Sequence, residues 1–456
     1  MNNQTYRPFL LLLCVTILLC ALRFVPSVTV MGTTMRQVDL LSDLFPRQDT
    51  AQEVSVSAEV IAKREEAKAN SNACPKGMTC ILDYGRGTDA GMATFYAALA
   101  RGGEALGRPV RIAYFGDSFI EGDILTADLR ALLQKRFGGC GVGYMDIASP
   151  LAGARSSVTQ RFEGWDVRCV LERGTFQPQK LGISLRYAMP STGAWTEVKA
   201  QKAFPCADRF ERSELMLAST SPVTLRAVCS DGSTERFTTR GDGALESVAV
   251  EGDFNKVRWV VEERGSQTVC YGVTAEGRSG ISVDNFSLRG SKGSELEEVP
   301  QAYWQSLAHL RPYDMVVLQY GLNVAEPERT DYKAYVAKMQ KVVEHLKAAF
   351  PHTTILIVGV GDRENKVNGE LHTMRGVLAL MQAQEELAAK CEVPYWNLYE
   401  AMGGDGSIVK MNSRKPEEAR KDYTHITHAG GKRLAGLLTK TLLYGYEEYR
   451  KENERK

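Results

Sequence analysis

Short and almost wholly apolar runs alternate with amphipathic segments through the last third of the chain. Three runs have the length and composition of buried strands: residues 315–320 (MVVLQY), 353–360 (TTILIVGV) and 393–398 (VPYWNL). Three other segments place apolar side chains at helical spacing: residues 331–350, 371–390 and 429–446. A strand without polar alternation is typical of a sheet that is covered on both faces. The pattern therefore predicts an α/β domain in which helices cover a parallel sheet.

An earlier part of the chain belongs to the same domain, and a segment with a different residue pattern separates the two parts. Residues 109–115 form a strand-type run that is followed by a helical pattern at residues 125–137. Residues 154–273 instead contain short alternating runs split by Gly, Asp, Asn and Ser, without a helical period. Closely spaced short strands are typical of a β-sandwich. We therefore predict an α/β domain, residues 80–153 and 274–456, with an inserted β-sandwich at residues 154–273.

The N-terminal segment is strongly apolar and lies outside this pattern. Residues 8–22 (PFLLLLCVTILLCAL) form a stretch of fifteen residues without a charge, between Arg7 and Arg23. This length fits both the apolar core of a cleaved signal sequence and a short membrane anchor. We expect residues 1–30 to be such a segment, which exports the protein in either case, and residues 31–79 to be a polar spacer.

The cysteines leave the compartment open. Two of the ten lie in the apolar segment, and the spacings of the others lack the paired Cys-x-x-Cys arrangement of zinc sites. Cys74 and Cys80 flank a short loop, which suits a local disulfide in an oxidising compartment. Buried free thiols explain the remaining cysteines equally well.

The overall charge argues against one class of partner. The chain has 56 Lys and Arg against 55 Asp and Glu, a formal net charge of +1 at pH 7. Nucleic-acid binding depends largely on a strongly basic surface. We therefore expect no nucleic-acid partner.

Ser118 is the first candidate for chemistry. It lies in the sequence Gly116-Asp117-Ser118, directly after the predicted strand 109–115 and before a helical pattern. Ligands of open parallel sheets bind beyond the carboxyl ends of the strands, and a helix N-terminus offers backbone N–H groups there. The alternative is that Asp117 and Ser118 only turn the chain and cap the helix.

A second candidate motif stands just before the last predicted helix. It reads Asp422-Tyr423-Thr424-His425. A serine nucleophile needs a base that takes its proton and a carboxylate that orients this base, and Asp422 and His425 are close enough in sequence to supply both. His428 is the competing base, and a turn with a solvated histidine is the alternative without function.

Two weaker signals also follow predicted strands. Asn323 comes shortly after the run 315–320, and Gly290 follows a strand-like segment at residues 280–288. An Asn amide and a Gly backbone N–H can both stabilise an oxyanion. Asn323 could equally close a turn, and Gly280 and Gly143 compete with Gly290 in the pattern.

Acidic residues just past Ser118 permit a different enzyme class. Glu121 and Asp123 could be the paired carboxylates of a glycosidase. We favour the simpler interpretation, because acidic side chains in the first turn of a helix already stabilise its positive end.

Taken together, the four motifs resemble the blocks of the SGNH (GDSL-type) hydrolases. These enzymes carry a Ser, a Gly, an Asn and a His in this order on a flavodoxin-like parallel sheet. Residues 116–144 (GDSFIEGDILTADLRALLQKRFGGCGVGY) look like the branch with bacterial peptidoglycan O-acetylesterases, in which a carbohydrate-binding-like β domain is inserted after the first block. The resemblance covers roughly residues 80–446, and the insert is matched by position and texture only.

The resemblance implies a role for each candidate residue. Ser118 would be the nucleophile, His425 the base and Asp422 the residue that orients it. The backbone N–H groups of Ser118 and Gly290 and the side chain of Asn323 would form the oxyanion hole. Two positions depart from the family pattern: Val324 stands where the third block often has Asp, and Phe119 replaces a His or Gln that is common in this branch.

These residues imply acyl transfer through a covalent acyl-enzyme, without a metal or organic cofactor. We expect an exported serine esterase that removes O-acetyl groups from a cell-wall carbohydrate such as peptidoglycan. Its partners would be an O-acylated carbohydrate polymer and, through the N-terminal segment, a membrane. The catalytic part would then lie in the periplasm, or outside the cell if the segment is cleaved. The alternatives are a carbohydrate O-acetyltransferase, a lipase-like esterase and a non-catalytic carbohydrate-binding protein of the envelope.

Overall fold

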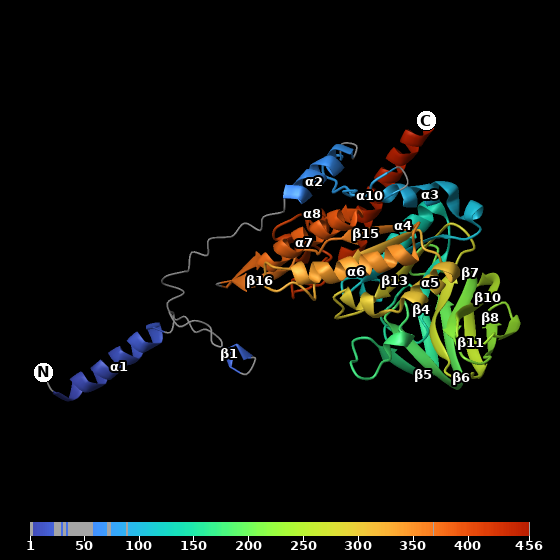
Figure 1. Cartoon of the computed structure of the whole chain (residues 1–456), viewed down its shortest axis with the longest axis horizontal. Helices are drawn as coiled ribbons and strands as arrows, with labels where there is room; N and C mark the ends of the chain where they lie inside the picture. Colours follow the sequence, from blue (N-terminus) through green and yellow to red (C-terminus); the bar gives the residue numbers. More distant parts are fainter. Residues whose placement is uncertain are drawn as a thin grey trace. The chain divides into compact units, whose positions relative to one another are not determined.

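The computed structural model describes residues 3–21, 29–30, 33–34, 58–70, 74–87, 90–367 and 369–455. The chain forms two compact units, Met1–Ser55 and Val56–Lys456 (Figure 1). The first unit contains helix α1 (Asn3–Ala21) and the two-residue strands β1 (Thr29–Val30) and β2 (Thr33–Thr34), which pair antiparallel.

Helix α1 contains most of the apolar N-terminal segment. Its uncharged part, residues 8–21, is roughly 21 Å long at 1.5 Å per residue, whereas the hydrocarbon core of a bilayer measures about 30 Å. In the described residues, no helix has both the length and the apolar character that crossing a membrane requires. Of the two alternatives expected for residues 1–30, the membrane anchor therefore finds no support in the described residues.

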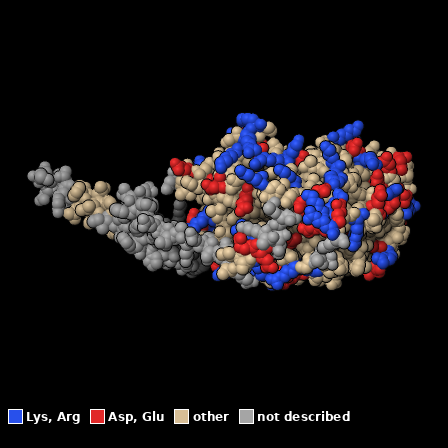
Figure 2. All heavy atoms as spheres, turned by 90° about the horizontal axis from the view of Figure 1, so that it is seen from above, with Lys and Arg blue, Asp and Glu red and all other residues tan. Residues whose placement is uncertain are grey.

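In its described residues, the second unit contains a parallel sheet, a larger antiparallel sheet, a two-stranded sheet of β16 (Glu364–Val367) and β17 (Glu370–Thr373), and nine α-helices. The helices are α2 (Ala58–Asn70), α3 (Met92–Leu106), α4 (Thr126–Phe137), α5 (Gln301–Leu310), α6 (Lys333–Ala349), α7 (Arg375–Cys391), α8 (Leu398–Met402), α9 (Ser407–Asn412) and α10 (His428–Glu454). Short 3₁₀ segments are η2 (Glu121–Asp123), η3 (Pro178–Lys180) and η4 (Ser294–Glu298). Positive and negative side chains are intermixed over the face that Figure 2 shows.

The first sheet has five parallel strands, in the order β13 (Ile281–Ser287), β3 (Val110–Gly116), β14 (Met315–Gln319), β15 (Thr354–Val358) and β18 (Tyr395–Trp396). Every residue of β3, β14 and β15 is buried, because helices cover the sheet. Helix α10 contacts α3 and α4, which in turn contact strands of the sheet, and these three helices form one group. Helix α6 contacts α5 and α7, and these three form a second group. This arrangement confirms the predicted α/β sheet.

The second sheet is antiparallel and has nine strands: β4 (Gly141–Asp146), β5 (Val158–Cys169), β6 (Arg186–Ala200), β7 (Phe210–Ala218), β8 (Thr224–Cys229), β9 (Thr234–Thr238), β10 (Leu245–Phe254), β11 (Lys256–Glu263) and β12 (Val269–Glu276). The expected sandwich would have two separate sheets. Instead, the long strand β6 pairs with β5, β11 and β12 and so joins all the strands. One apolar cluster draws on strands from both ends of the order, so the sheet curls around a single core.

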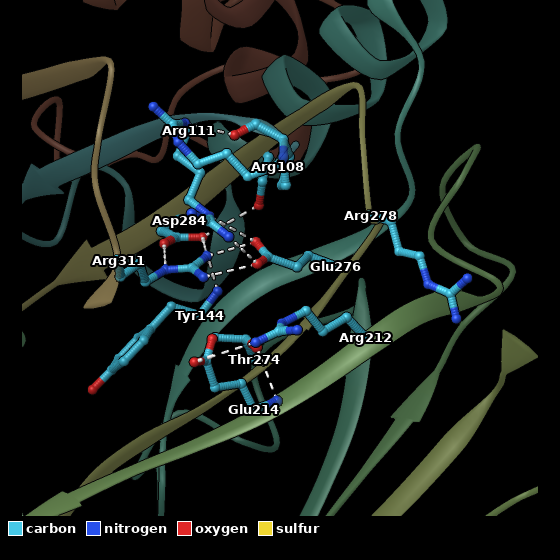
Figure 3. A network of polar contacts seen from close by, with 12 residues as sticks. Arg108, Arg111, Tyr144, Arg212, Glu214, Thr274, Glu276, Arg278, Asp284 and Arg311 are labelled. Atoms are coloured by element: carbon cyan, nitrogen blue, oxygen red, sulfur yellow. Dashed lines mark hydrogen bonds and ion pairs between the residues drawn. The ribbon is translucent and has the colours of Figure 1, made fainter. Parts of the chain in front are cut away.

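Buried ion pairs join the two sheets (Figure 3). Glu276, at the end of β12, accepts hydrogen bonds from Arg311 at 2.8 and 2.9 Å and from Arg111 of β3 at 2.8 and 3.3 Å. Arg311 also donates to Asp284 of β13 at 2.8 and 3.0 Å. Burial alone would raise the pKa of Glu276, but the guanidinium groups of Arg111 and Arg311 hold it well below its usual value. The cluster fixes the antiparallel sheet against the edge of the parallel sheet.

Part of the predicted spacer packs on the α/β domain. Arg64 of α2 forms an ion pair with Glu385 of α7 at 3.0 Å. Further along, Cys74 and Cys80 form a disulfide, as their spacing suggested. Leu82 then pairs with Tyr395 of β18. The chain is therefore attached to the parallel sheet before the first long strand begins.

Candidate active site

The carboxyl ends of four parallel strands meet at one edge of the first sheet. The strand register aligns Gly116 of β3 with Ser287 of β13 and Gln319 of β14, and it aligns Gln319 with Val358 of β15. Ser118, Gly290 and Asn323 each follow one of these strand ends by a few residues. The fold thus brings three separate sequence motifs to one edge of the sheet.

A hydrogen-bonded chain of three side chains lies at this edge. Ser118 Oγ is 2.9 Å from His425 Nε2, and His425 Nδ1 is 2.9 Å from Asp422 Oδ2. Ser118, His425 and Asp422 therefore have the arrangement that a serine nucleophile, its base and an orienting carboxylate require. The ring beside Ser118 is that of His425. The competing base, His428, begins α10 and forms no hydrogen bond with Ser118 or Asp422 within the described residues.

The loop that carries Asp422 and His425 is fixed by its own backbone. Asp422 Oδ1 accepts hydrogen bonds from the N–H groups of Thr424 and His425, each at 3.0 Å. Together with the histidine ring these donors lower the pKa of Asp422, although partial burial opposes them. Tyr423, between these residues, has a positive φ of 49°, a conformation that side chains with a Cβ seldom adopt. The loop therefore holds the carboxylate beside the histidine ring with a strained backbone at Tyr423.

The candidate oxyanion donors converge near Ser118. Leu288 N–H donates to Gly116 O at 2.9 Å, which holds the Gly290 segment beside the Ser118 segment. Asn323 Nδ2 donates to Ser291 O at 2.9 Å, next to Gly290. In the described part of the chain, the N–H groups of Ser118 and Gly290 donate to no protein acceptor. Two backbone donors and the second hydrogen of the Asn323 amide are thus left for a ligand.

The competing glycines lie elsewhere. Gly280 precedes β13 and so stands at the amino end of that strand, opposite the edge with Ser118. Gly143 is inside β4, where a Cβ would meet Asp284. Of the three glycines in the pattern, only Gly290 follows the carboxyl end of β13.

The two acidic residues after Ser118 are engaged in ion pairs. Asp123 is 2% exposed and binds Arg130 and Arg155 at 3.2 and 2.8 Å. These two arginines hold its pKa far below the usual value although burial opposes them. Glu121 pairs with Arg289. Both carboxylates are thus engaged by arginines, and the pKa of Asp123 is lowered, whereas a glycosidase needs a raised pKa in its general acid. The geometry therefore gives no support to that class.

Asp117 is buried directly beside the candidate nucleophile. It is 2% exposed, and its Oδ1 accepts a hydrogen bond from Phe119 N–H at 2.9 Å. Its Oδ2 is buried without a close hydrogen-bond partner. Burial raises the pKa of Asp117 to about 6, and the backbone N–H groups of Phe119, Leu322 and Gly321 offset this effect only in part. The ionised carboxylate is therefore disfavoured in the folded protein.

This raised pKa predicts a pH-dependent stability. Asp117 favours the folded state at pH values below about 4, and this contribution is lost as the pH rises through about 6. Asp117→Asn keeps an acceptor for Phe119 but cannot ionise. The free energy of unfolding of the variant, minus that of the parent, should rise by about 2 kcal/mol between pH 4 and pH 7. Urea unfolding at both pH values measures this difference, and a constant difference would contradict the assignment.

Sequence reasoning missed one segment of the site, residues 359–364 after β15. A Cβ on Gly361 would lie 3.5 Å from the ring of Phe119, and a Cβ on Gly321 would lie 2.7 Å from Val360. Arg363 Nη1 donates to Leu322 O at 3.0 Å, and Glu364 N–H donates to Tyr423 O at 3.1 Å. The segment therefore contacts the loops of Ser118, Asn323 and His425. The signal in the sequence that could have found this segment is its position at the end of the predicted strand 353–360.

The candidate site is open to solvent. The side chains of His425 and Asp422 are 31% and 47% exposed. A large cavity, about 980 Å³ in volume, instead lies at the amino ends of the strands, where Arg101, His309 and His352 line it. None of the candidate catalytic residues borders that cavity. In the described residues, no group of three or more His, Cys, Asp and Glu side chains could hold a metal ion.

Comparison with known proteins gives a match at the level of structure only. No known protein family and no curated protein matches the sequence. The fold matches a peptidoglycan O-acetylesterase structure with a TM-score of 0.66 and 22% identity, over 81% of this chain and 99% of that chain. Two further structures match with TM-scores too low to carry an argument. They are a family two carbohydrate esterase from Cellvibrio japonicus (TM-score 0.25, 10% identity, 62% and 98% covered) and a salicylyl-acyltransferase from a tetracycline biosynthetic pathway (TM-score 0.29, 13% identity, 66% and 96% covered).

The first of these matches shows that the chain shares the fold of a peptidoglycan O-acetylesterase structure. Because the match spans 81% of this chain, it includes residues of both the parallel sheet and the antiparallel sheet. The predicted α/β fold with an inserted β domain is thus confirmed at the level of the fold.

Proposed function

We propose that the protein is a serine esterase that removes O-acetyl groups from a carbohydrate polymer of the peptidoglycan kind. The observation that carries this proposal is the chain of hydrogen bonds from Ser118 through His425 to Asp422 at the carboxyl edge of the parallel sheet. The exposure of the site favours a polymer, because a shallow surface admits a chain that an enclosed pocket would exclude. The fold that the protein shares with a peptidoglycan O-acetylesterase supports the same substrate class.

The geometry suits a two-step acyl transfer. Ser118 Oγ attacks the ester carbonyl carbon while His425 Nε2 takes the hydroxyl proton, and Asp422 stabilises the charged ring. The negative oxygen lies between the N–H groups of Ser118 and Gly290 and the amide of Asn323. The sugar alcohol leaves with the proton from His425. Water then attacks the acetyl-enzyme, His425 again serves as base, and acetate and free Ser118 are formed.

We also propose that this reaction takes place outside the cytoplasm. The apolar N-terminal segment has the length of the core of an export signal. The disulfide between Cys74 and Cys80 is of a kind that persists in oxidising compartments. A cell-wall polymer would be accessible to the enzyme there.

Acetate release from three substrates tests the proposed function. The full chain should release acetate from O-acetylated peptidoglycan and from p-nitrophenyl acetate, and more slowly from O-acetylated xylan. Activity on p-nitrophenyl acetate alone would support the esterase activity but would rule out the proposed polymer substrate. A fluorophosphonate probe should label Ser118 in the same preparation. If neither labelling nor release occurs, the protein is a non-catalytic binding protein and the proposal is wrong.

A further inference from the structure

Arg363 lies at the candidate oxyanion hole with an uncompensated charge. One of its nitrogens, Nη1, donates to Leu322 O at 3.0 Å, and Leu322 directly precedes Asn323. Within the described residues, the Arg363 side chain forms no ion pair and no other hydrogen bond, while its backbone carbonyl accepts from Met374 N–H at 2.9 Å. In this part of the chain its Nε and Nη2 atoms have no hydrogen-bond partner, and they are not buried, so they are accessible to solvent. The guanidinium is thus anchored on one side and free on the other.

The neighbouring carboxylates do not neutralise this charge. Asp362 binds Thr373 Oγ1 at 2.8 Å and the N–H of Ile408 at 2.9 Å. Glu364 accepts from Thr373 Oγ1 at 3.4 Å. The buried arginines of this protein behave differently, because Arg130 and Arg311 each pair with a carboxylate within 3.2 Å. A half-buried arginine without such a partner is expensive to keep unless a ligand supplies the negative charge.

The free atoms define the kind of ligand. Nε and Nη2 form one edge of the guanidinium plane, and two parallel N–H groups on this edge match the two oxygens of a carboxylate. We infer that Arg363 binds a carboxylate of the substrate close to the ester that Ser118 attacks. This inference rests on the proposed function and narrows it, because it requires an acetylated sugar that also carries an acidic group. The lactyl group of muramic acid offers such a carboxylate where no peptide is attached to it, so the substrate implied is a peptidoglycan strand without its stem peptides.

A pair of small substrates tests the inference. One is O-acetylated N-acetylmuramic acid, and the other is its methyl ester, in which the carboxylate is masked. The full chain should prefer the acid over the methyl ester by at least roughly tenfold in kcat/KM, the usual effect of a charge-assisted pair of hydrogen bonds. In Arg363→Gln this preference should fall to near one, and Arg363→Lys should keep part of it.

Arg101→Gln is the matched control. Arg101 is exposed, lines the distant cavity and has no ion pair in the described residues, so its replacement changes the net charge equally. The preference should persist in this variant. An equal loss of both substrates in Arg363→Gln would mean that Arg363 only braces Leu322 and would overturn the inference.

Two outcomes separate the inference from the proposed function. If the parent hydrolyses the acid and the methyl ester equally well, Arg363 does not bind a substrate carboxylate and the inference is wrong. The proposed esterase function would not be affected by this result. Acetate release from neither of these compounds nor from O-acetylated peptidoglycan would remove the proposed function and the inference with it. If Arg363→Gln fails to fold, inhibition of p-nitrophenyl acetate hydrolysis in the parent decides the question, because N-acetylmuramic acid should inhibit at least roughly tenfold better than its methyl ester.

Discussion

Replacement of Ser118 by alanine is expected to lower kcat for p-nitrophenyl acetate by roughly 10⁴-fold or more. The Ser118 hydroxyl lies 2.9 Å from His425 Nε2, and no other hydroxyl in the described residues contacts that ring. Without it no acyl-enzyme can form, and the oxyanion donors and the His425–Asp422 pair remain only to assist direct attack by water. Steady-state kinetics of the purified variant measures the effect, and an unchanged melting temperature shows that the fold is preserved.

Asp422→Asn supplies the control for this prediction. An amide cannot balance the charge of the histidine ring, so kcat should fall by about 10²- to 10⁴-fold. Residues that act as one unit are not additive, so the double variant with Ser118→Ala should lose no more than Ser118→Ala alone. Additive losses would show that Ser118 and Asp422 act separately, which contradicts the hydrogen-bonded chain through His425.

Replacement of Arg311 by methionine is expected to reduce the free energy of unfolding by about 3–5 kcal/mol. Arg311 is 1% exposed and pairs with Glu276 and Asp284, whose side chains are wholly buried. Methionine fills much of the volume but leaves both carboxylates with fewer partners in a medium that solvates them poorly (Figure 3). Because this cluster joins the two sheets, the loss should affect the whole second unit.

Urea unfolding of Arg311→Met beside Arg136→Met measures this effect. Arg136 pairs with Glu447 at 3.0 Å, but both side chains are more than 40% exposed. Exposed pairs contribute little, so Arg136→Met should cost less than about 1 kcal/mol. Similar losses in the two variants would refute the view that burial makes the Arg311 cluster important for the junction.

The sequence was sufficient to predict the layers of the fold because the strands are locally distinctive. Residues 315–320 and 353–360 are almost wholly apolar, and the structure places β14 and β15 there, fully buried. The helix predicted at residues 125–137 is α4. Ser118 and His425 could be named because each stands beside a predicted strand end or helix start. Their proximity, however, is visible only once the sheet is assembled.

Other features depend on contacts between distant residues and were not predictable. Residues 371–373 were expected to begin a helix, but they form β17 (Glu370–Thr373), which pairs with β16 (Glu364–Val367). Strand β4 pairs with β12, more than a hundred residues later, so local texture could not reveal that it belongs to the antiparallel sheet. The unpaired charge of Arg363 is likewise invisible, because the sequence does not show which carboxylates lie near it. The membrane-spanning segment was an expectation from composition that the helices of the described residues do not support.

Acetate release from O-acetylated peptidoglycan, measured side by side for the full chain and for Ser118→Ala, shows whether Ser118 is the nucleophile of a polymer esterase. We expect steady release by the parent and none above background by the variant. Equal release by both proteins would contradict Ser118 as the nucleophile. Activity of the parent on p-nitrophenyl acetate without any release from the polymer would contradict the proposed substrate while leaving the catalytic residues in place.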